Sequence, residues 1–196
     1  MKKVMVVAAA GVFAALWACG SDNGTVRIIL TDAPIDGVES LKVTVSKVEI
    51  HLVAGGVTDG GWNGVQKDLG DTEAADDDNA WRVVSDKVQT FDLLTLRNGV
   101  TVLLGEGDVP EGRVTQVRLT LDKAEAVVKG KTLPVDCPAS CATTGIKIAT
   151  QGALAVSAGL ASEITLDFVA AASLKDDGKG GYKMEHVIKV VREEQR

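Results

Sequence analysis

Aspartates gather in one short segment of the chain, where their spacing could support metal chemistry. Asp68, Asp71 and the run Asp76, Asp77 and Asp78 lie close together there. Calcium needs several oxygen ligands at once, and a carboxylate-rich loop can supply them. The segment lacks the alternating Asp-x-Asp-x-Asp-Gly order of a dedicated calcium loop. A solvated acidic loop is therefore the expectation, and Ca²⁺ bound by Asp71, Asp76, Asp77 and Asp78 is the alternative.

Two further groups carry metal chemistry in a less complete form. The turn sequence Asp176-Asp177-Gly178 is acidic but does not provide a full set of ligands. The two histidines, His51 and His186, could meet across a sheet and bind zinc with Glu49 or Glu185. Separate solvent-facing positions explain the two histidines more simply.

Cys19 stands where an export signal would end. Lys2 and Lys3 precede an uncharged apolar run from Val4 to Ala18, and the sequence Leu16-Trp17-Ala18 leads into the cysteine. This arrangement resembles the bacterial lipobox, in which the cysteine is lipidated and the preceding peptide is removed. We therefore expect a mature chain that begins at Cys19 and is held at a membrane by acyl chains such as palmitate. An ordinary signal peptide that happens to contain a cysteine is the alternative.

Cys137 and Cys141 remain as an even pair once Cys19 is assigned to lipid. An oxidising envelope favours a disulfide between them, which would stabilise the fold by about 2 kcal/mol because the closed loop is short. The alternative is a redox or metal pair. The spacing is wider than the two-residue gap of thioredoxin-like and zinc motifs, and no other cysteine or nearby histidine completes a site.

Asp32 and Lys147 are isolated residues that could contact a ligand. Asp32, in Thr-Asp-Ala-Pro, could be a ligand or a catalytic acid, but a cap on nearby backbone N–H groups is the expectation. Lys147, beside Gly145, could contact an anion. An exposed strand lysine, or a salt bridge to a carboxylate such as Asp167, is expected instead.

Sequence motifs of common catalytic sites are missing. The chain has no Gly-x-Ser-x-Gly elbow, no phosphate-binding glycine loop and no His-Glu-x-x-His run. Trp62 and Trp81 flank the acidic loop and could stack on a sugar ring, although Trp81 stands at a strand start, which favours a core or anchoring role. The sequence thus predicts a protein that is not an enzyme.

Charge and length narrow the classes of partner. The chain has 196 residues, with 21 Lys and Arg against 27 Asp and Glu, and a net charge of −6. Like charges repel, so neither nucleic acid nor an anionic lipid surface is an expected partner. The length is enough for one domain with a sizeable core.

Short apolar runs broken by turn formers predict strands. The apolar phase shifts between Val45 and Val48, which indicates a β-bulge. A short turn near 90–96 is the one helical signal after the signal peptide. We predict an all-β fold, a two-sheet antiparallel β-sandwich of immunoglobulin-like or transthyretin-like type. The strands are expected at 25–30, 41–52, 81–84, 99–104, 114–121, 125–128, 131–135, 146–149, 154–156, 164–168 and 183–191.

Six sequence segments occur in an order that marks a family. They are Leu30-Thr31-Asp32-Ala33-Pro34, Asp92-Leu93-Leu94-Thr95-Leu96-Arg97-Asn98-Gly99, Thr115-Gln116-Val117-Arg118-Leu119, Thr144-Gly145-Ile146-Lys147, Leu166-Asp167-Phe168 and Val187-Ile188-Lys189-Val190. Over about 24–191 the chain resembles a domain-of-unknown-function family of bacterial and archaeal surface lipoproteins. The resemblance implies a β-sandwich behind a lipobox, with no established activity. It singles out motif residues without a role: Asp32, Pro34, Asp92, Gln116, Arg118, Gly145, Lys147 and Asp167.

The resulting domain plan has three parts. Residues 1–18 are a lipoprotein signal peptide, 19–24 the lipidated cysteine and a short tether, and 25–192 the sandwich, with a long acidic loop at about 55–79. Gly20 follows the lipidated cysteine, which favours the outer membrane in a cell that has two.

We expect a lipid-anchored, non-enzymatic envelope module that binds or scaffolds through its loops, with a glycan, a protein or calcium as its partner. The alternative is an envelope carbohydrate-active hydrolase with paired carboxylates.

Overall fold

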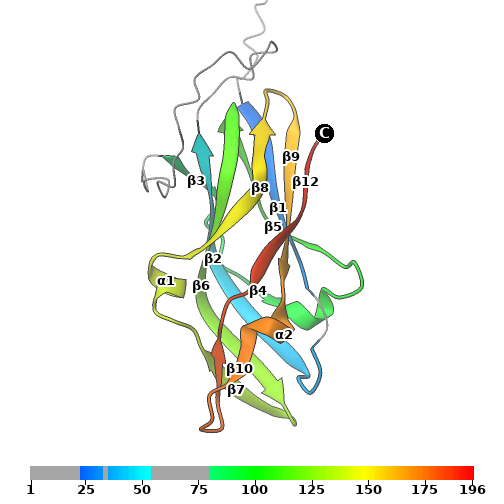
Figure 1. The fold of residues 1–196 in the computed structure, drawn as a ribbon, viewed down its shortest axis with the longest axis vertical. Coiled ribbons are helices and arrows are strands. Elements are labelled where there is room, and N and C mark those ends of the chain that lie inside the picture. Colours follow the sequence, from blue (N-terminus) through cyan, green and yellow to red (C-terminus); the bar gives the residue numbers. More distant parts are fainter. Residues whose placement is uncertain (1–22, 33–34, 54–79) are drawn as a thin grey trace, which may run out of the picture.

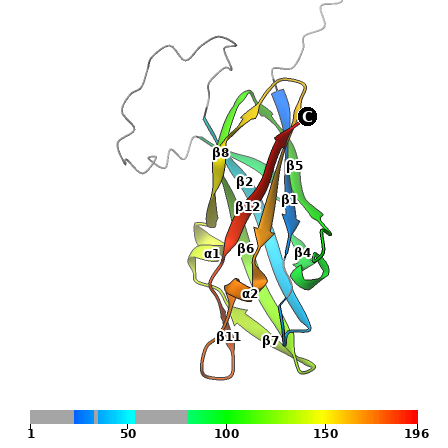
Figure 2. The ribbon, with the colours of Figure 1, turned by 45° about the vertical axis from the view of Figure 1, so that its right-hand side comes forward.

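Two β-sheets packed face to face form the part of the chain that this computed structural model describes, residues 23–32, 35–53 and 80–196 (Figures 1 and 2). The two-sheet β-sandwich is therefore confirmed. It is not wholly antiparallel, because two pairs of strands are parallel: β1 (Asn23–Thr31) with β9 (Ala161–Phe168), and β7 (Lys131–Asp136) with β11 (Tyr182–Met184). None of the helices among the described residues is long and apolar enough to cross a membrane.

The smaller sheet has four strands in the order β12-β9-β1-β5. In β1, buried residues alternate with partly exposed ones, so Val26, Ile28 and Leu30 all point into the core. The strands are β1 (Asn23–Thr31), β5 (Val102–Pro110), β9 (Ala161–Phe168) and β12 (Ile188–Gln195).

The larger sheet has eight strands built around two long neighbours, β2 and β6. One edge of β6 pairs with β8 and then with β7, while the far edge of β2 pairs with β4 and then with β3. The strands are β2 (Ser40–Val53), β3 (Trp81–Ser85), β4 (Gln89–Asp92), β6 (Gly112–Val128), β7 (Lys131–Asp136), β8 (Ile146–Val156), β10 (Leu174–Asp176) and β11 (Tyr182–Met184).

Several strand boundaries differ from those predicted. The expected strands 114–121 and 125–128 are one continuous β6, 146–149 and 154–156 are one β8, and 183–191 is divided into β11 and β12. The expected turn near 90–96 is β4 followed by the 3₁₀ helix η2 (Leu93–Thr95). Two four-residue helices, α1 (Ser140–Thr143) and α2 (Ala170–Ser173), were not predicted because one helical turn leaves no periodic pattern.

A bulge in β2 decides which side chains face outward. The register between β2 and β6 shifts between Thr44 and Lys47, which confirms the predicted irregularity. Before the shift the apolar core residues are odd-numbered, as at Val45, and after it they are even-numbered, as at Val48. Lys47 therefore lies on the outer face of the sheet, as do the odd-numbered residues after it.

The two described ends of the chain meet at one end of the sandwich. The N–H of Gly159 donates to the carbonyl of Asn23 at 3.0 Å, and the N–H of Arg196 donates to the carbonyl of Ala161 at 2.8 Å. One end is thus held by the turn between β8 and β9, and the other by the first residue of β9. Figure 1 shows them at the top of the molecule.

Candidate binding site on the outer face of the larger sheet

Strand register places three charged residues in one row across the larger sheet. Glu49 on β2 is the partner of Arg118 on β6, and Arg118 is the partner of Lys147 on β8. The residues on either side of Arg118, Val117 and Leu119, are buried in the core, so Arg118 points away from it. Cross-strand partners on one face have side chains close enough to interact.

Glu49 holds the row together. Arg118 Nε donates to Glu49 Oε2 at 2.8 Å, and Lys47 Nζ forms an ion pair with Glu49 Oε1 at 3.2 Å. Burial raises the pKa of Glu49, but the hydrogen bonds and charges of Arg118 and Lys47 outweigh this effect and bring the pKa below its ordinary value. Glu49 is therefore an ionised carboxylate that fixes the orientation of Arg118.

The ring of Trp81 lies beneath the guanidinium group of Arg118. The guanidinium carbon of Arg118 lies 4.0 Å from the centroid of the Trp81 ring, a cation–π arrangement. His51 meets the same ring edge-on at 5.2 Å, and its Nδ1 lies 2.7 Å from Thr115 Oγ1. Trp81 is only 7% exposed. Its ring is thus occupied by protein side chains, in keeping with the predicted anchoring role, and is not an open platform for a sugar.

Gly145 makes room for Arg118. Its φ is +73°, a backbone conformation that side chains rarely adopt, and a Cβ atom there would lie 2.7 Å from Arg118 Cγ. The close approach of these two motif residues was not predicted, because it depends on the pairing of β6 with β8.

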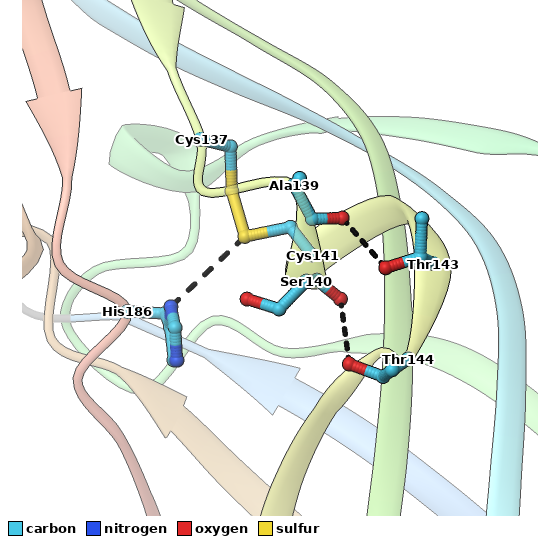
Figure 3. The surroundings of a disulfide bond; sticks show 7 residues. All are labelled: Cys137, Ala139, Ser140, Cys141, Thr143, Thr144 and His186. Carbon is cyan, nitrogen blue, oxygen red and sulfur yellow. Dashed lines mark hydrogen bonds between the residues drawn. A yellow bond between two sulfur atoms is a disulfide. The ribbon is translucent and has the colours of Figure 1, made fainter.

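The disulfide between Cys137 and Cys141 that the sequence predicts is present in the structure (Figure 3). It closes the segment that contains the start of α1, and Cys141 is buried against the core. His186 Nδ1 lies 4.0 Å from Cys141 Sγ.

Two threonines at the end of α1 direct their hydroxyl protons to the backbone. Thr143 Oγ1 donates to the carbonyl of Ala139 at 2.9 Å, and Thr144 Oγ1 donates to that of Ser140 at 3.3 Å (Figure 3). The helix lies beside β6, so both threonines reach the row of charges.

The row of charged residues on β2, β6 and β8 and the threonines at the end of α1 line a polar pocket of about 260 Å³. Its lining holds three cationic side chains and one carboxylate, although the chain as a whole carries a net charge of −6. Such a pocket attracts anions through its local excess of positive charge. The residues that line it are Lys47, Glu49, Arg118, Thr120, Thr143, Thr144 and Lys147.

The pocket does not have the geometry of a glycosidase. That chemistry needs two carboxyl groups across a cleft, one of them with a raised pKa so that it can act as an acid. Glu49 is the single carboxylate in the lining, and its pKa is lowered. The described residues therefore place no general acid in this pocket.

The side chain of Asp32 accepts a hydrogen bond from the backbone. Its Oδ1 accepts a hydrogen bond at 3.0 Å from the N–H of Ala170, the first residue of α2. The side chain is buried, and the contact joins the end of β1 to the end of β9. The backbone N–H that it accepts here is distant from Asp32 in the sequence.

Asp92 and Gln116 have structural neighbours rather than a place in the pocket lining. The carboxylate of Asp92 accepts from the N–H groups of Leu94 and Leu41, each at 3.2 Å, and from Ser40 Oγ at 2.7 Å. It therefore ties η2 to the start of β2. Gln116 lies on the outer face of β6 opposite His51.

Of the two expected alternatives for Lys147, the exposed strand lysine is the correct one and the salt bridge to Asp167 is wrong. Asp167 lies on β9 of the smaller sheet, where its register partner is Lys189 on β12, whereas Lys147 lies on β8 beside Arg118. Burial raises the pKa of Asp167, and the charge of Lys189 opposes that shift. Asp167 Oδ1 is buried and has no hydrogen-bond partner among the described residues.

The acidic turn after β10 binds its own backbone. Asp176 Oδ1 accepts from the N–H of Gly178 at 2.6 Å, and Asp177 Oδ1 accepts from the N–H groups of Lys179 and Gly181 at 2.7 and 2.8 Å. These backbone hydrogen bonds lower the pKa of Asp177. The turn is thus an Asx-type turn.

Metal ligands do not converge within the described ranges. No group of three or more His, Cys, Asp or Glu side chains there could hold a metal ion. His51 lies against Trp81, whereas His186 lies beside the disulfide, so the two histidines belong to separate environments. The remaining sequence candidates lie outside the described residues: Cys19, Pro34, Trp62, Asp71, Asp76, Asp77 and Asp78.

Sequence reasoning missed Lys47, Glu49, Thr143 and Thr144 as members of the pocket. The phase shift in β2 was the available signal, because it turns the odd-numbered residues after it outward. Nothing in the sequence placed the end of α1 over β6.

Comparisons with known proteins give a family but no activity. The model of a family described as "Domain of unknown function (DUF4382)" matches residues 23–185, most of the chain. No curated protein matches the chain.

Among solved structures, the chain is similar to a "putative cell adhesion protein" from Bacteroides eggerthii DSM 20697, with a TM-score of 0.36 and 12% identity over 89% of this chain and 55% of that one. A protein of the same description from Bacteroides uniformis ATCC 8492 gives a TM-score of 0.21 and 13% identity over 87% of this chain and 50% of that one. The chain spans about half the length of these two proteins. At these TM-scores the likenesses carry no argument about function.

Proposed function

We propose that this chain, which belongs to the DUF4382 family, is a lipid-anchored protein of the cell envelope that binds an anionic ligand in the pocket around Arg118 and catalyses no reaction. The ligand belongs to a soluble or polymeric partner in the envelope. The outer membrane is the favoured location, on the ground of Gly20.

The anchor is supported by the sequence before the fold. Lys2, Lys3, the apolar run and Ala18 before Cys19 form a lipobox-like signal. Cys19 is separated from Asn23, the first residue of β1, by only three residues. A lipid on Cys19 would therefore hold the sandwich close to the membrane by the end at which Asn23 lies.

The convergence of family-motif residues is the observation that carries the binding function. Arg118, Gly145 and Lys147 come from two separate motifs, yet Arg118 and Lys147 line one pocket and Gly145 leaves room for Arg118. Arg118 is held in place by Glu49 and Trp81 before any ligand arrives. A preorganised guanidinium loses little side-chain entropy on binding, so it suits recognition of an anion.

Anion binding is tested by NMR titration of the soluble chain Gly20–Arg196, which contains the whole described sandwich. Acetate, sulfate and glucuronate are each expected to shift the Trp81 indole resonance and the amide resonances of Thr143 and Thr144. Lys47→Gln, which leaves the pairing of Glu49 with Arg118 in place, should weaken each response. If no anion shifts these resonances, the binding function is wrong.

The matched control is Arg27→Gln. Arg27 forms the same type of contact, from Nε to Glu106 Oε2, but on the exposed face of the smaller sheet. This variant should leave every titration unchanged.

The anchor is tested separately by expression of the full chain and of Cys19→Ala in a bacterium. The unaltered chain should fractionate with membranes and carry the mass of attached acyl chains. The variant should lose both properties, and an unlipidated Cys19 in the membrane fraction would contradict the proposal.

A further inference from the structure

The cationic side of the pocket can only donate hydrogen bonds. Arg118 uses Nε on Glu49, and its two terminal amino groups make no hydrogen bond with the described residues. Lys47 adds an ammonium group, which has donors and no acceptor. A ligand at this side must therefore bring acceptors, and a carboxylate matches the planar guanidinium.

The α1 side of the pocket has the opposite character. Each threonine hydroxyl has one proton, and Thr143 and Thr144 give theirs to the carbonyls of Ala139 and Ser140 (Figure 3). What these two oxygen atoms still offer is lone pairs. A ligand beside them must bring donors, and a fully ionised sulfate or a simple carboxylate such as acetate has none.

Size and aromatic content narrow the ligand further. The pocket, at about 260 Å³, lies just below the range of about 300–1,000 Å³ usual for ligand sites, so it suits one small unit. No aromatic ring is among its lining residues, and Trp81 lies beneath Arg118. Stacking of a neutral sugar ring therefore has no support here, and recognition depends on charge and hydrogen bonds.

We propose that the pocket binds a sugar acid, a carboxylate with hydroxyl groups beside it, as in a uronate. The carboxylate contacts Arg118 and Lys47, and the hydroxyl groups donate to Thr143 and Thr144. This proposal rests on the proposed function and adds the class of ligand. The acid is either a free sugar acid or one unit of an acidic polysaccharide, since the two share this chemistry.

The test compares four probes on ¹⁵N-labelled Gly20–Arg196: glucuronate, glucose, acetate and sulfate. Glucuronate should bind at least about tenfold more tightly than acetate or sulfate, which corresponds to about 1.4 kcal/mol. Glucose should leave the Thr143, Thr144 and Trp81 resonances unmoved. Acetate and sulfate that bind as tightly as glucuronate would overturn the sugar-acid inference and leave the anion site standing. If none of the charged probes shifts these resonances, the proposed function itself is wrong.

Variants of the threonines separate the two sides of the pocket. The double variant Thr143→Val, Thr144→Val keeps the side-chain shape and removes the acceptors, so it should reduce glucuronate binding to the level of acetate. Thr95→Val is the matched control, because Thr95 Oγ1 also donates to a backbone carbonyl, that of Asp92, at an exposed site outside the pocket. If the double variant keeps the preference for glucuronate, the threonines are not its acceptors and the inference is wrong.

A short galacturonate oligomer distinguishes the two sources of the acid. If the oligomer binds more tightly than monomeric galacturonate, the ligand is a unit of a polysaccharide. If the oligomer and monomeric galacturonate bind equally, the ligand is a free sugar acid. An oligomer that does not bind, together with a monomer that does not, overturns the inference.

Discussion

A Cβ atom at Gly145 would lie 2.7 Å from Cγ of Arg118, closer than side-chain atoms normally approach. The two residues belong to different sequence motifs: Arg118 lies on β6, and Gly145 immediately precedes the neighbouring strand β8. This proximity gives the glycine a reason that the sequence did not show: it leaves the space in which the guanidinium group of Arg118 lies over the Trp81 ring. Gly145 therefore serves the placement of the Arg118 cation as well as the turn before β8.

Gly145→Ala should therefore cost stability and displace Arg118. Positive φ alone disfavours alanine by about 1 kcal/mol. The overlap with Arg118 adds to this cost, and we expect a total loss of about 2 kcal/mol in the free energy of unfolding. Urea denaturation measures the loss, and the Trp81 indole resonance reports the movement of the guanidinium.

Gly159→Ala is the control for this variant. Gly159 has the same φ of +73° but nothing within 4 Å of its added Cβ. It should lose only the backbone contribution. Equal losses for the two variants would show that Arg118 does not need the space at Gly145.

Glu49→Gln should make stability less dependent on acid pH. The pKa of Glu49 is lowered from 4.5 in the folded state, so the unfolded chain binds its proton more readily. Its contribution is present above pH 4.5 and is lost as the pH falls through the folded pKa. At pH 7 we expect the variant to be less stable by about 1–3 kcal/mol, and the difference should shrink below pH 4.5.

Glu106→Gln provides the comparison for Glu49. Glu106 pairs with Arg27, and both side chains are 44% exposed, so removal of its charge should change stability by less than about 1 kcal/mol. Thermal melts from pH 3 to pH 7 test both variants. A pH-independent gap between Glu49→Gln and the unaltered chain would contradict the argument.

Asp167→Asn should have the opposite effect at neutral pH. Burial raises the pKa of Asp167 above 3.8, so the folded state holds the proton more tightly and stability falls as the pH rises through the folded pKa. Asparagine removes this cost. The variant should be more stable at pH 7, by less than about 1 kcal/mol because the group is partly exposed to solvent, and the gain should disappear below pH 3.8.

Asp86→Asn changes an exposed carboxylate in the same way and should not reproduce the gain. Urea denaturation at pH 7 and pH 3 compares the two variants. Destabilisation by Asp167→Asn at pH 7 would show that the ionised form is the favoured one.

Loss of the disulfide should loosen the α1 side of the pocket. Replacement of Cys137 and Cys141 by serine is expected to cost about 2 kcal/mol, because the bond closes a short loop. The amide resonances of Thr143 and Thr144 should broaden or shift in the variant. Alkylation followed by mass measurement tests the bond in the native protein, where free thiols before reduction would contradict it.

The fold class could be predicted from the alternation of apolar residues, but strand pairing could not. The parallel contact of β1 with β9 joins segments far apart in the sequence, and local patterns carry no information about such partners. The bulge in β2 was predicted because a one-residue phase shift is visible in the order of apolar residues.

In the candidate site, too, the sequence singled out individual residues but did not predict which of them lie together. The family resemblance gave Arg118, Gly145 and Lys147 as residues without a role, and only the register of β2, β6 and β8 brought them to Glu49. The hydrogen bond from Ala170 to Asp32 could not be predicted for a related reason. Asx patterns in a sequence report local backbone contacts, whereas this N–H comes from a helix 138 residues further along the chain.

The hydrogen bond from Ala170 to Asp32 forms where the end of β1 lies beside the end of β9, and this strand pairing affects the order of folding. β1 lies between β5 and β9, so one of its edges stays open until the segment Ala161–Phe168 has joined the sheet. Closure over so long a stretch of chain is entropically costly and therefore slow. A chain truncated before β9 would expose that strand edge to other chains and should aggregate. The smaller sheet is thus completed late, by residues from the last third of the chain.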